Sequence, residues 1–151
     1  SRDPEALVRQ FHATYRLPVF TGSATADIER IHMRMGLIAE EFAELMGAVY
    51  GPDAERAVLE AVAAAVAADV HTRDTVETAD ALADLIYVIY GMALETGIPL
   101  DAVLHEVQRS NMSKLGTDGE PIYREDGKVL KGPGFFDPDI AAVLARTRLA
   151  P

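Results

Sequence analysis

The fold is indicated most clearly by residues 75–96, which read TVETADALADLIYVIYGMALET. Between positions 81 and 94 this stretch contains a single charged residue, Asp84. Gly97 follows the last apolar position, and a glycine there is typical of a helix end, so the pattern predicts one long helix. Because a helix that is apolar on every side is buried on every side, we expect this helix to lie inside packed protein.

Three acidic residues of this helix fall on one stripe. Glu77, Asp80 and Asp84 stand at i, i+3 and i+7, which places them within roughly a 60° arc. A carboxylate left unpaired in packed protein is strongly unfavourable. No lysine or arginine stands at a matching spacing, since Arg73 is a full turn upstream. We therefore expect a bound cation to neutralise these acids.

A second acidic stripe lies upstream, where the sequence also predicts a helix. Glu40, Glu41 and Glu44 stand at i, i+1 and i+4, which places them within roughly a 100° arc. A solvated acidic edge gives the same pattern, so this stripe alone does not decide between surface and site. Taken together, the two stripes predict a cage of carboxylate oxygens for Mg²⁺ or Mn²⁺, which retains water and substrate phosphates as its other ligands.

The rest of the chain is also predicted to be mainly helical. Asp126-Gly127, between two short apolar runs, predicts a small hairpin over residues 122–131. Thr72 or Asp74 can cap the helix described first. We expect a single domain over residues 1–151 with an all-α helical bundle. Its other helices are predicted from apolar spacing and breakers at about residues 5–15, 27–50, 53–68, 100–112 and 139–149.

Composition excludes several classes of protein. The formal net charge is -10, which argues against a nucleic-acid partner because clustered basic residues supply most of that affinity. The chain has no cysteine, which excludes thiolate metal sites and disulfides. We find neither a signal-peptide pattern nor a run of 18 apolar residues, so we expect a cytoplasmic protein with no membrane partner.

Other catalytic motifs are not found. The four histidines form no His-Glu-x-x-His pair, because Arg109 stands where the second histidine after His105-Glu106 would be needed. The chain has neither the glycine-rich dinucleotide fingerprint nor a P-loop. The acidic stripes are therefore the strongest candidates for chemistry.

The stripes carry a resemblance to a known superfamily. Residues 40–44 (EEFAE) and 77–80 (ETAD) look like the paired Glu-x-x-Glu and Glu-x-x-Asp motifs of the all-α NTP pyrophosphatases. This superfamily includes MazG-like proteins, dimeric dUTP pyrophosphatases and phosphoribosyl-ATP pyrophosphohydrolase. Residues 84–87 (DLIY), 110–114 (SNMSK) and 127–133 (GKVLKGP) are similar to the MazG-like branch that hydrolyses dUTP.

The resemblance covers about residues 5–140 and departs from the simpler members at one point. The separation between the two acidic motifs is longer here, because an Ala-rich helix and its connection to His71 are inserted. The insertion leaves the predicted ligands intact and bears on the oligomeric packing and the base pocket. The resemblance implies a MazG-like helical bundle and a metal-dependent hydrolase.

The resemblance also implies roles for individual residues. More than one Mg²⁺ or Mn²⁺ ion would be held by Glu41, Glu44, Glu77 and Asp80. Glu40 is expected to be either a further ligand or the base that orients water, a role that Glu41 could share, and Asp84 to support the ligands one turn on. The residues expected to contact substrate are Tyr87, Asn111, Lys114, Lys128 and Lys131.

Alternatives stay open for these substrate residues. Lys114 could instead interact with the dipole of the preceding helix end. Lys128 and Lys131, together with Arg124, could belong to a solvated hairpin, and Tyr87 could be a core aromatic. The choice of base rests on the resemblance alone.

We expect the protein to convert a nucleoside triphosphate, dUTP first, to the monophosphate and pyrophosphate. Phosphoribosyl-ATP pyrophosphohydrolysis is a second interpretation, since it uses the same acidic motifs. A non-enzymatic helical dimerisation module, whose acids only keep it in solution, is a third. Because so apolar a helix needs cover in a chain this size, we expect a homodimer or a higher homo-oligomer.

Overall fold

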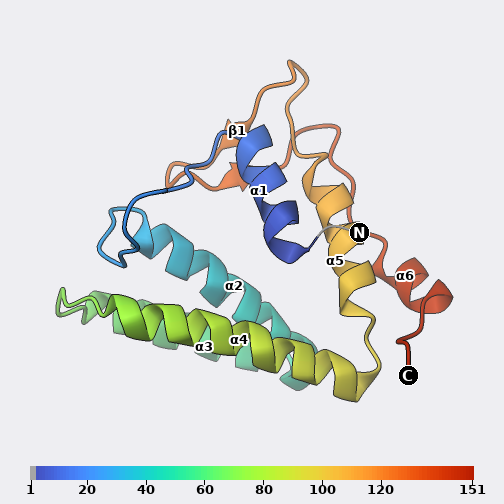
Figure 1. The fold of residues 1–151 in the computed structure, drawn as a ribbon, viewed down its shortest axis with the longest axis horizontal. Coiled ribbons are helices and arrows are strands. Elements are labelled where there is room, and N and C mark those ends of the chain that lie inside the picture. The colour runs from blue at the N-terminus through green and yellow to red at the C-terminus, as the bar shows by residue number, and fades with distance from the viewer. Residues whose placement is uncertain (1–2) are drawn as a thin grey trace. The chain divides into compact units, whose positions relative to one another are not determined.

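The computed structural model describes residues 3–151; Ser1 and Arg2, which belong to the predicted domain, lie outside the described residues. The predicted all-α class is confirmed, with one two-stranded sheet among the described residues (Figure 1). The elements are α1 Pro4–Thr14, α2 Ile31–Tyr50, α3 Pro52–Ala67, α4 Thr75–Thr96, α5 Leu100–Asn111, β1 Ile122–Tyr123, β2 Val129–Leu130 and α6 Ile140–Arg146.

The chain divides into two compact units. The α2–α3 unit comprises Ser23–Ala79 and includes the first turn of α4. The α5 unit comprises residues 3–22 and Asp80–Pro151, with α1, the rest of α4, α5, the hairpin and α6. Each unit has its own packing and is described by itself.

A tight turn at Gly51 folds α2 back on α3. Gly51 has a φ of 101°, a value that favours glycine, and its N–H donates to Gly47 O at 2.9 Å. Pro52 then begins α3, where its missing N–H costs no helical hydrogen bond. The two helices lie side by side (Figure 1). Ala43 is buried on the packed face of α2, and Gly47 on that face leaves room for Glu55 of α3.

Side-chain hydrogen bonds hold the connection between α3 and α4. Asp69 accepts two hydrogen bonds of 3.0 Å from the guanidinium of Arg73, which lowers the pKa of that carboxyl. The Asp74 carboxylate accepts from the Glu77 N–H at 3.0 Å. Asp74 therefore caps α4, as the sequence predicts.

Helix α5 is the centre of the other unit and packs against α1 and α6. Its Glu106 is 8% exposed and accepts two hydrogen bonds from Arg109, at 2.9 and 2.8 Å. The same carboxylate accepts from the Asp139 N–H at 2.7 Å, just before α6. The Ser110 hydroxyl donates to Phe136 O at 2.7 Å. Polar groups that α5 buries are thus paired within the chain.

The predicted hairpin is confirmed, although its strands are short. Ile122 pairs with Leu130 and Tyr123 with Val129 in antiparallel register. Gly127 has a φ of 96°, which is the reason for a glycine after Asp126.

Two predicted helix boundaries are wrong. Helix α2 begins at Ile31 and not near Asp27; threonine hydroxyls accept the N–H groups of Ala26 and Asp27, both at 3.0 Å, in the segment before it. Helix α6 is shorter than predicted because Thr147 adopts an extended conformation, with a φ of -124°.

The expectation that α4 is buried on every side is not met within the single chain. Ala93 is the one buried residue of α4, and every residue from 79 to 89 is exposed. The core interpretation of Tyr87 fails with it, since its side chain is 81% exposed. An apolar surface predicts that something covers a helix, but it does not show that the cover comes from the same chain.

No single described helix is long and apolar enough to cross a membrane. Only α4 and α5 together pass by length and composition, and a bend of 113° separates them.

Candidate active site

The acids of α2 lie away from the face that packs on α3. At 100° per residue, Glu41 and Glu44 stand roughly 120–180° around the helix from the buried Ala39 and Ala43. Both glutamates are exposed, whereas Glu40, closer to the packed face, is half-buried. Glu41 and Glu44 therefore lie on the exposed side of the α2–α3 helix pair.

The acids of α4 are exposed as well. Within the described residues of their own units, the carboxylates of Glu77, Asp80 and Asp84 have neither an ion pair nor a hydrogen bond. Arg73, the basic residue nearest to them in the sequence, is held by Asp69. This arrangement agrees with the prediction that α4 supplies no lysine or arginine to neutralise its own acids.

The chemistry of these donors fits a hard divalent cation. Carboxylate oxygens are the side-chain ligands that Mg²⁺ and Mn²⁺ prefer, and exposed carboxylates leave room for water and phosphate. In neither unit do the described residues bring three histidine, aspartate or glutamate side chains close enough to hold an ion. Of the predicted ligands, Glu41, Glu44 and Glu77 belong to the α2–α3 unit and Asp80 to the α5 unit.

Two of the predicted substrate lysines are brought together in the α5 unit. Lys114 is half-buried after the end of α5, with its Nζ 5.9 Å from the centre of the Phe11 ring. Its carbonyl accepts a hydrogen bond of 2.8 Å from the Gly132 N–H. Lys131 directly precedes Gly132, so this backbone contact joins the segments that carry the two lysines.

Gly132 is required at this contact by close packing. A Cβ atom at this position would lie 2.0 Å from Leu115 O and 2.8 Å from Lys114 O. Because both are backbone atoms, they cannot move aside as a flexible side chain would. This explains the glycine that follows Lys131 in the GKVLKGP segment.

The remaining hairpin cations differ in their surroundings. Arg124 donates two hydrogen bonds to Asp126, at 2.9 and 2.6 Å, which lowers the pKa of that carboxyl to about 2. Arg124 therefore stabilises the hairpin turn. Lys128 is half-buried and Lys131 is exposed, with its Nζ 4.7 Å from the centre of the Phe135 ring.

Asn111 and Lys114 are linked by a residue that the sequence did not single out. The Tyr15 hydroxyl donates to Asn111 O at 2.7 Å and accepts from the Lys114 N–H at 3.0 Å. Apolar spacing places Tyr15 on the inner face of α1 but carries no information on its hydroxyl. No sequence signal could have revealed this contact.

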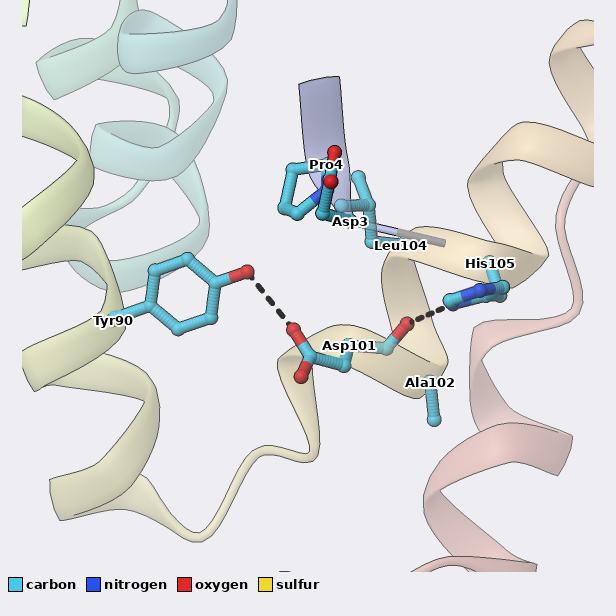
Figure 2. A pocket seen from close by; sticks show the side chains of 7 residues that line it. All are labelled: Asp3, Pro4, Tyr90, Asp101, Ala102, Leu104 and His105. Atoms are coloured by element: carbon cyan, nitrogen blue, oxygen red, sulfur yellow. Dashed lines mark hydrogen bonds between the residues drawn. The ribbon is translucent and has the colours of Figure 1, made fainter. Parts of the chain in front are cut away.

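Two cavities lie within single units, and neither is lined by a predicted site residue. The larger is open, about 660 Å³, and is bounded by the N-terminal end of α1, α4 and α5 (Figure 2). There the Tyr90 hydroxyl donates to Asp101 at 2.9 Å, and the His105 ring lies 2.8 Å from Asp101 O. The other, about 410 Å³, is lined chiefly by apolar side chains of α2 and α3 and by the Asp69–Arg73 pair.

Comparison with known proteins identifies the family. The sequence profile of the phosphoribosyl-ATP pyrophosphohydrolase family matches residues 8–111, which contain both acidic motifs. No curated protein matches the chain significantly. The crystal structure of a candidate NTP pyrophosphohydrolase from Exiguobacterium sp. 255-15 is similar over 96% of this chain and 95% of that one. The two share 30% sequence identity and superpose with a TM-score of 0.69.

These matches favour an enzyme over a non-enzymatic dimerisation module, and they give its reaction class as hydrolysis of a nucleotide pyrophosphate. The structural match extends past the end of the profile match, because it covers nearly the whole chain. The chain belongs to the phosphoribosyl-ATP pyrophosphohydrolase family, within the MazG-like all-α NTP pyrophosphohydrolase superfamily.

Proposed function

We propose that the protein hydrolyses a nucleoside triphosphate, dUTP before others, to the monophosphate and pyrophosphate, and that it depends on Mg²⁺ or Mn²⁺. The observation that carries this proposal is the structural match to an NTP pyrophosphohydrolase over nearly the whole chain. The exposed carboxylates of α2 and α4 support it, because they offer the ligands that such ions prefer.

The metal would be held by Glu41, Glu44, Glu77 and Asp80, with Asp84 supporting them from the next turn of α4. When bound, such an ion lowers the pKa of a coordinated water and offsets the charge that develops on phosphate oxygens. We propose that more than one such ion is bound.

In the proposed reaction, the protein's own groups promote a displacement at the α-phosphorus. A carboxylate of Glu40 or Glu41 accepts a hydrogen bond from a water molecule and then its proton. The water oxygen forms a bond to the α-phosphorus while the bond from that phosphorus to the bridging oxygen breaks. Pyrophosphate leaves with the bonding electrons, and the charge on its oxygens is what nearby lysines would stabilise.

The basic segment beside the end of α5 is suited to hold the phosphates. Lysine acts as a point charge toward phosphate, and backbone contact already joins the segments of Lys114 and Lys131. Lys128 would add a third cation and Asn111 a polar contact. The exposed ring of Tyr87 is available to stack on a base.

A second substrate is favoured by the family match itself. Phosphoribosyl-ATP contains a triphosphate, so its conversion uses the same cleavage next to the α-phosphorus. The match to that family ends at residue 111 and leaves the hairpin lysines outside. Because the hairpin segment resembles the dUTP-hydrolysing branch, we place dUTP first.

A nucleotide panel tests this proposal. Purified protein with Mg²⁺ would be given dUTP, the other common nucleoside triphosphates and phosphoribosyl-ATP, and pyrophosphate release would be measured. We expect the highest kcat/KM for dUTP. A preference for phosphoribosyl-ATP would replace the proposed substrate, and no pyrophosphate from any of them would overturn the function.

The position of attack has its own test. Hydrolysis in ¹⁸O-labelled water is expected to place the label in the monophosphate, because the water oxygen joins the α-phosphorus. Label in pyrophosphate would show attack at the β-phosphorus and contradict the scheme.

We also propose that the active protein is at least a homodimer in which α4 packs against a second copy. Apolar side chains that include Leu82, Ile86 and Ile89 are about half exposed or more along α4. Seven such side chains on this helix represent roughly 650 Å² of surface, close to the roughly 800 Å² that one partner contributes to a standard interface. The other residues of this apolar surface are Leu85, Val88, Met92 and Leu94, with Tyr87 left free to contact the base.

A further inference from the structure

Tyr15 is a side chain that the reaction scheme does not use, yet it is 0% exposed. Its hydroxyl donates to Asn111 O at 2.7 Å and accepts from the Lys114 N–H at 3.0 Å. Burial raises the pKa of Tyr15, so the hydroxyl remains protonated and able to donate at neutral pH. One hydroxyl thus bonds the backbone of two predicted substrate residues, Asn111 at the end of α5 and Lys114 just after it.

The backbone on the C-terminal side of Lys114 is hydrogen-bonded as well. Its carbonyl accepts from the Gly132 N–H at 2.8 Å. The Tyr123 hydroxyl of the hairpin donates to Tyr15 O at 2.6 Å. Both backbone groups of Lys114 are therefore hydrogen-bonded. Its N–H bonds Tyr15 and, at the longer distance of 3.3 Å, Asn111 O, and Tyr15 is itself tied to the hairpin that carries Lys131.

We infer that Tyr15 is a positioning residue for phosphate binding, because its buried hydroxyl fixes the Asn111–Lys114 turn and so holds the backbone of Lys114 against the segment that carries Lys131. This inference rests on the proposed function, in which Lys114 contacts the polyphosphate of the substrate. Tyr15 would not touch the substrate. It acts through the backbone of residues that do.

The chemistry of the contact separates positioning from packing. Phenylalanine at position 15 would keep the ring, including its packing against Phe11, where the ring centres are 4.5 Å apart. The substitution would remove only the hydroxyl and its two hydrogen bonds. Tyr90 offers a matched control, because its hydroxyl also makes a hydrogen bond, to Asp101 at 2.9 Å, away from Lys114.

The test combines kinetics with a mutant cycle. For the best nucleotide of the panel, Tyr15→Phe is expected to raise KM about fivefold with a smaller change in kcat, as for lost uniform binding. Tyr90→Phe should leave KM as in the wild type. In a Lys114→Ala background, Tyr15→Phe should raise KM by a clearly smaller factor than in the wild type, because part of its effect acts through Lys114 and the rest through Asn111.

Amide hydrogen exchange gives a readout that needs no activity. The Lys114 amide is expected to exchange about tenfold faster in Tyr15→Phe and at the wild-type rate in Tyr90→Phe. Calorimetric titration of inorganic tripolyphosphate with Mg²⁺ should give a matching rise in Kd in Tyr15→Phe. If Tyr15→Phe does not fold, Tyr123→Phe, which loosens the same assembly from the hairpin, should raise KM and Kd in the same direction.

The outcomes separate this inference from the proposed function. Pyrophosphate release with a wild-type KM in Tyr15→Phe would overturn the inference alone, as would equal factors on KM with and without Lys114. If no nucleotide releases pyrophosphate, the proposed function fails. In that case tripolyphosphate binding that weakens in Tyr15→Phe would still support the inference, and binding that is unchanged or not detected would overturn it.

Discussion

The acidic residues of two helices that are consecutive in the chain, α4 and α5, lie in opposite environments. Glu106 of α5 is buried, and Arg109 and the Asp139 N–H bind its carboxylate and lower its pKa to about 2. Asp80 and Asp84 of α4 are exposed and have no such partners among the described residues of their unit. An acid that stabilises the fold is paired by it, whereas acids that the fold leaves open can serve a ligand.

The apolar residues of the two helices differ in the same way. Helix α5 contacts α1 and α6, so its apolar side has cover within the chain. Helix α4 has one buried residue, Ala93, and Ile86 is 59% exposed. Helix α5 thus belongs to the core of one chain, whereas the single chain leaves α4 uncovered, which is why we propose a second copy as its cover.

The largest expected effect tests the acids of α4. Asp80→Asn keeps the shape of the side chain and removes its charge, so kcat/KM should fall by more than about 100-fold. Loss of a residue that only supports a metal ligand would lower kcat/KM by less. The unfolding temperature should stay within about 1 °C of the wild type, because exposed substitutions seldom change stability. Steady-state kinetics and thermal melts measure the two quantities.

Glu60→Gln on α3 is the control, since Glu60 is exposed and lies outside the predicted site. It should leave both quantities unchanged. Full activity in Asp80→Asn would mean that α4 carries no ligand.

The next effect concerns the apolar surface of α4. Ile86→Lys would place an ammonium group in the proposed interface and should weaken self-association by at least about 100-fold, since each 1.4 kcal/mol is a factor of ten. Sedimentation velocity over a concentration series measures the change. Val70→Lys, which replaces an exposed apolar residue outside α4, should leave association unchanged. A wild-type monomer at micromolar concentration would contradict the interface.

A smaller effect is expected where the hairpin meets the end of α5. Gly132→Ala forces a Cβ against the Leu115 carbonyl and should cost about 1–3 kcal/mol of folding stability, as other overpacked sites do. Gly134→Ala, where a Cβ would have nothing within 4 Å, is the matched control. Chemical unfolding curves compare the two. Equal stabilities would show that the close contact at Gly132 relaxes without cost.

The last prediction concerns pH and Glu106. Its pKa is lowered from 4.5 to about 2, chiefly by the Arg109 hydrogen bonds. The stability that it contributes is therefore present above pH 4.5 and is lost as the pH falls from there toward 2. Glu106→Gln should lower the unfolding temperature at pH 7 with kcat/KM retained, and the difference from the wild type should shrink toward pH 2. A difference that is the same at both pH values would contradict this assignment.

Much of the fold follows from local patterns in the sequence. Helix ends at Gly51 and Gly97 and the hairpin turn at Gly127 could be predicted, because each depends on the backbone freedom of one glycine. The start of α2 could not, since the Ala26 N–H is taken by the hydroxyl of Thr75, which is remote in sequence. The exposure of α4 within the single chain could not be predicted, because periodicity does not say which chain covers a helix.

The candidate site, too, could be predicted only where it depends on local spacing and not where it depends on remote contacts. The two acidic stripes are visible in the sequence because helical spacing alone places their members on common faces. Tyr15 is not, because its hydroxyl acts on the backbone of Asn111 and Lys114, about a hundred positions away. Such contacts depend on the packing of α1 against α5, which spacing within one helix does not determine.

The most direct test of the central claim is a calorimetric titration of Mn²⁺ into chelator-treated protein. We expect the wild type and Glu106→Gln to bind the ion alike and Asp80→Asn to bind it much more weakly. No binding to the wild type at millimolar Mn²⁺, or equal binding to Asp80→Asn, would contradict the claim that the open acids of α2 and α4 hold the metal.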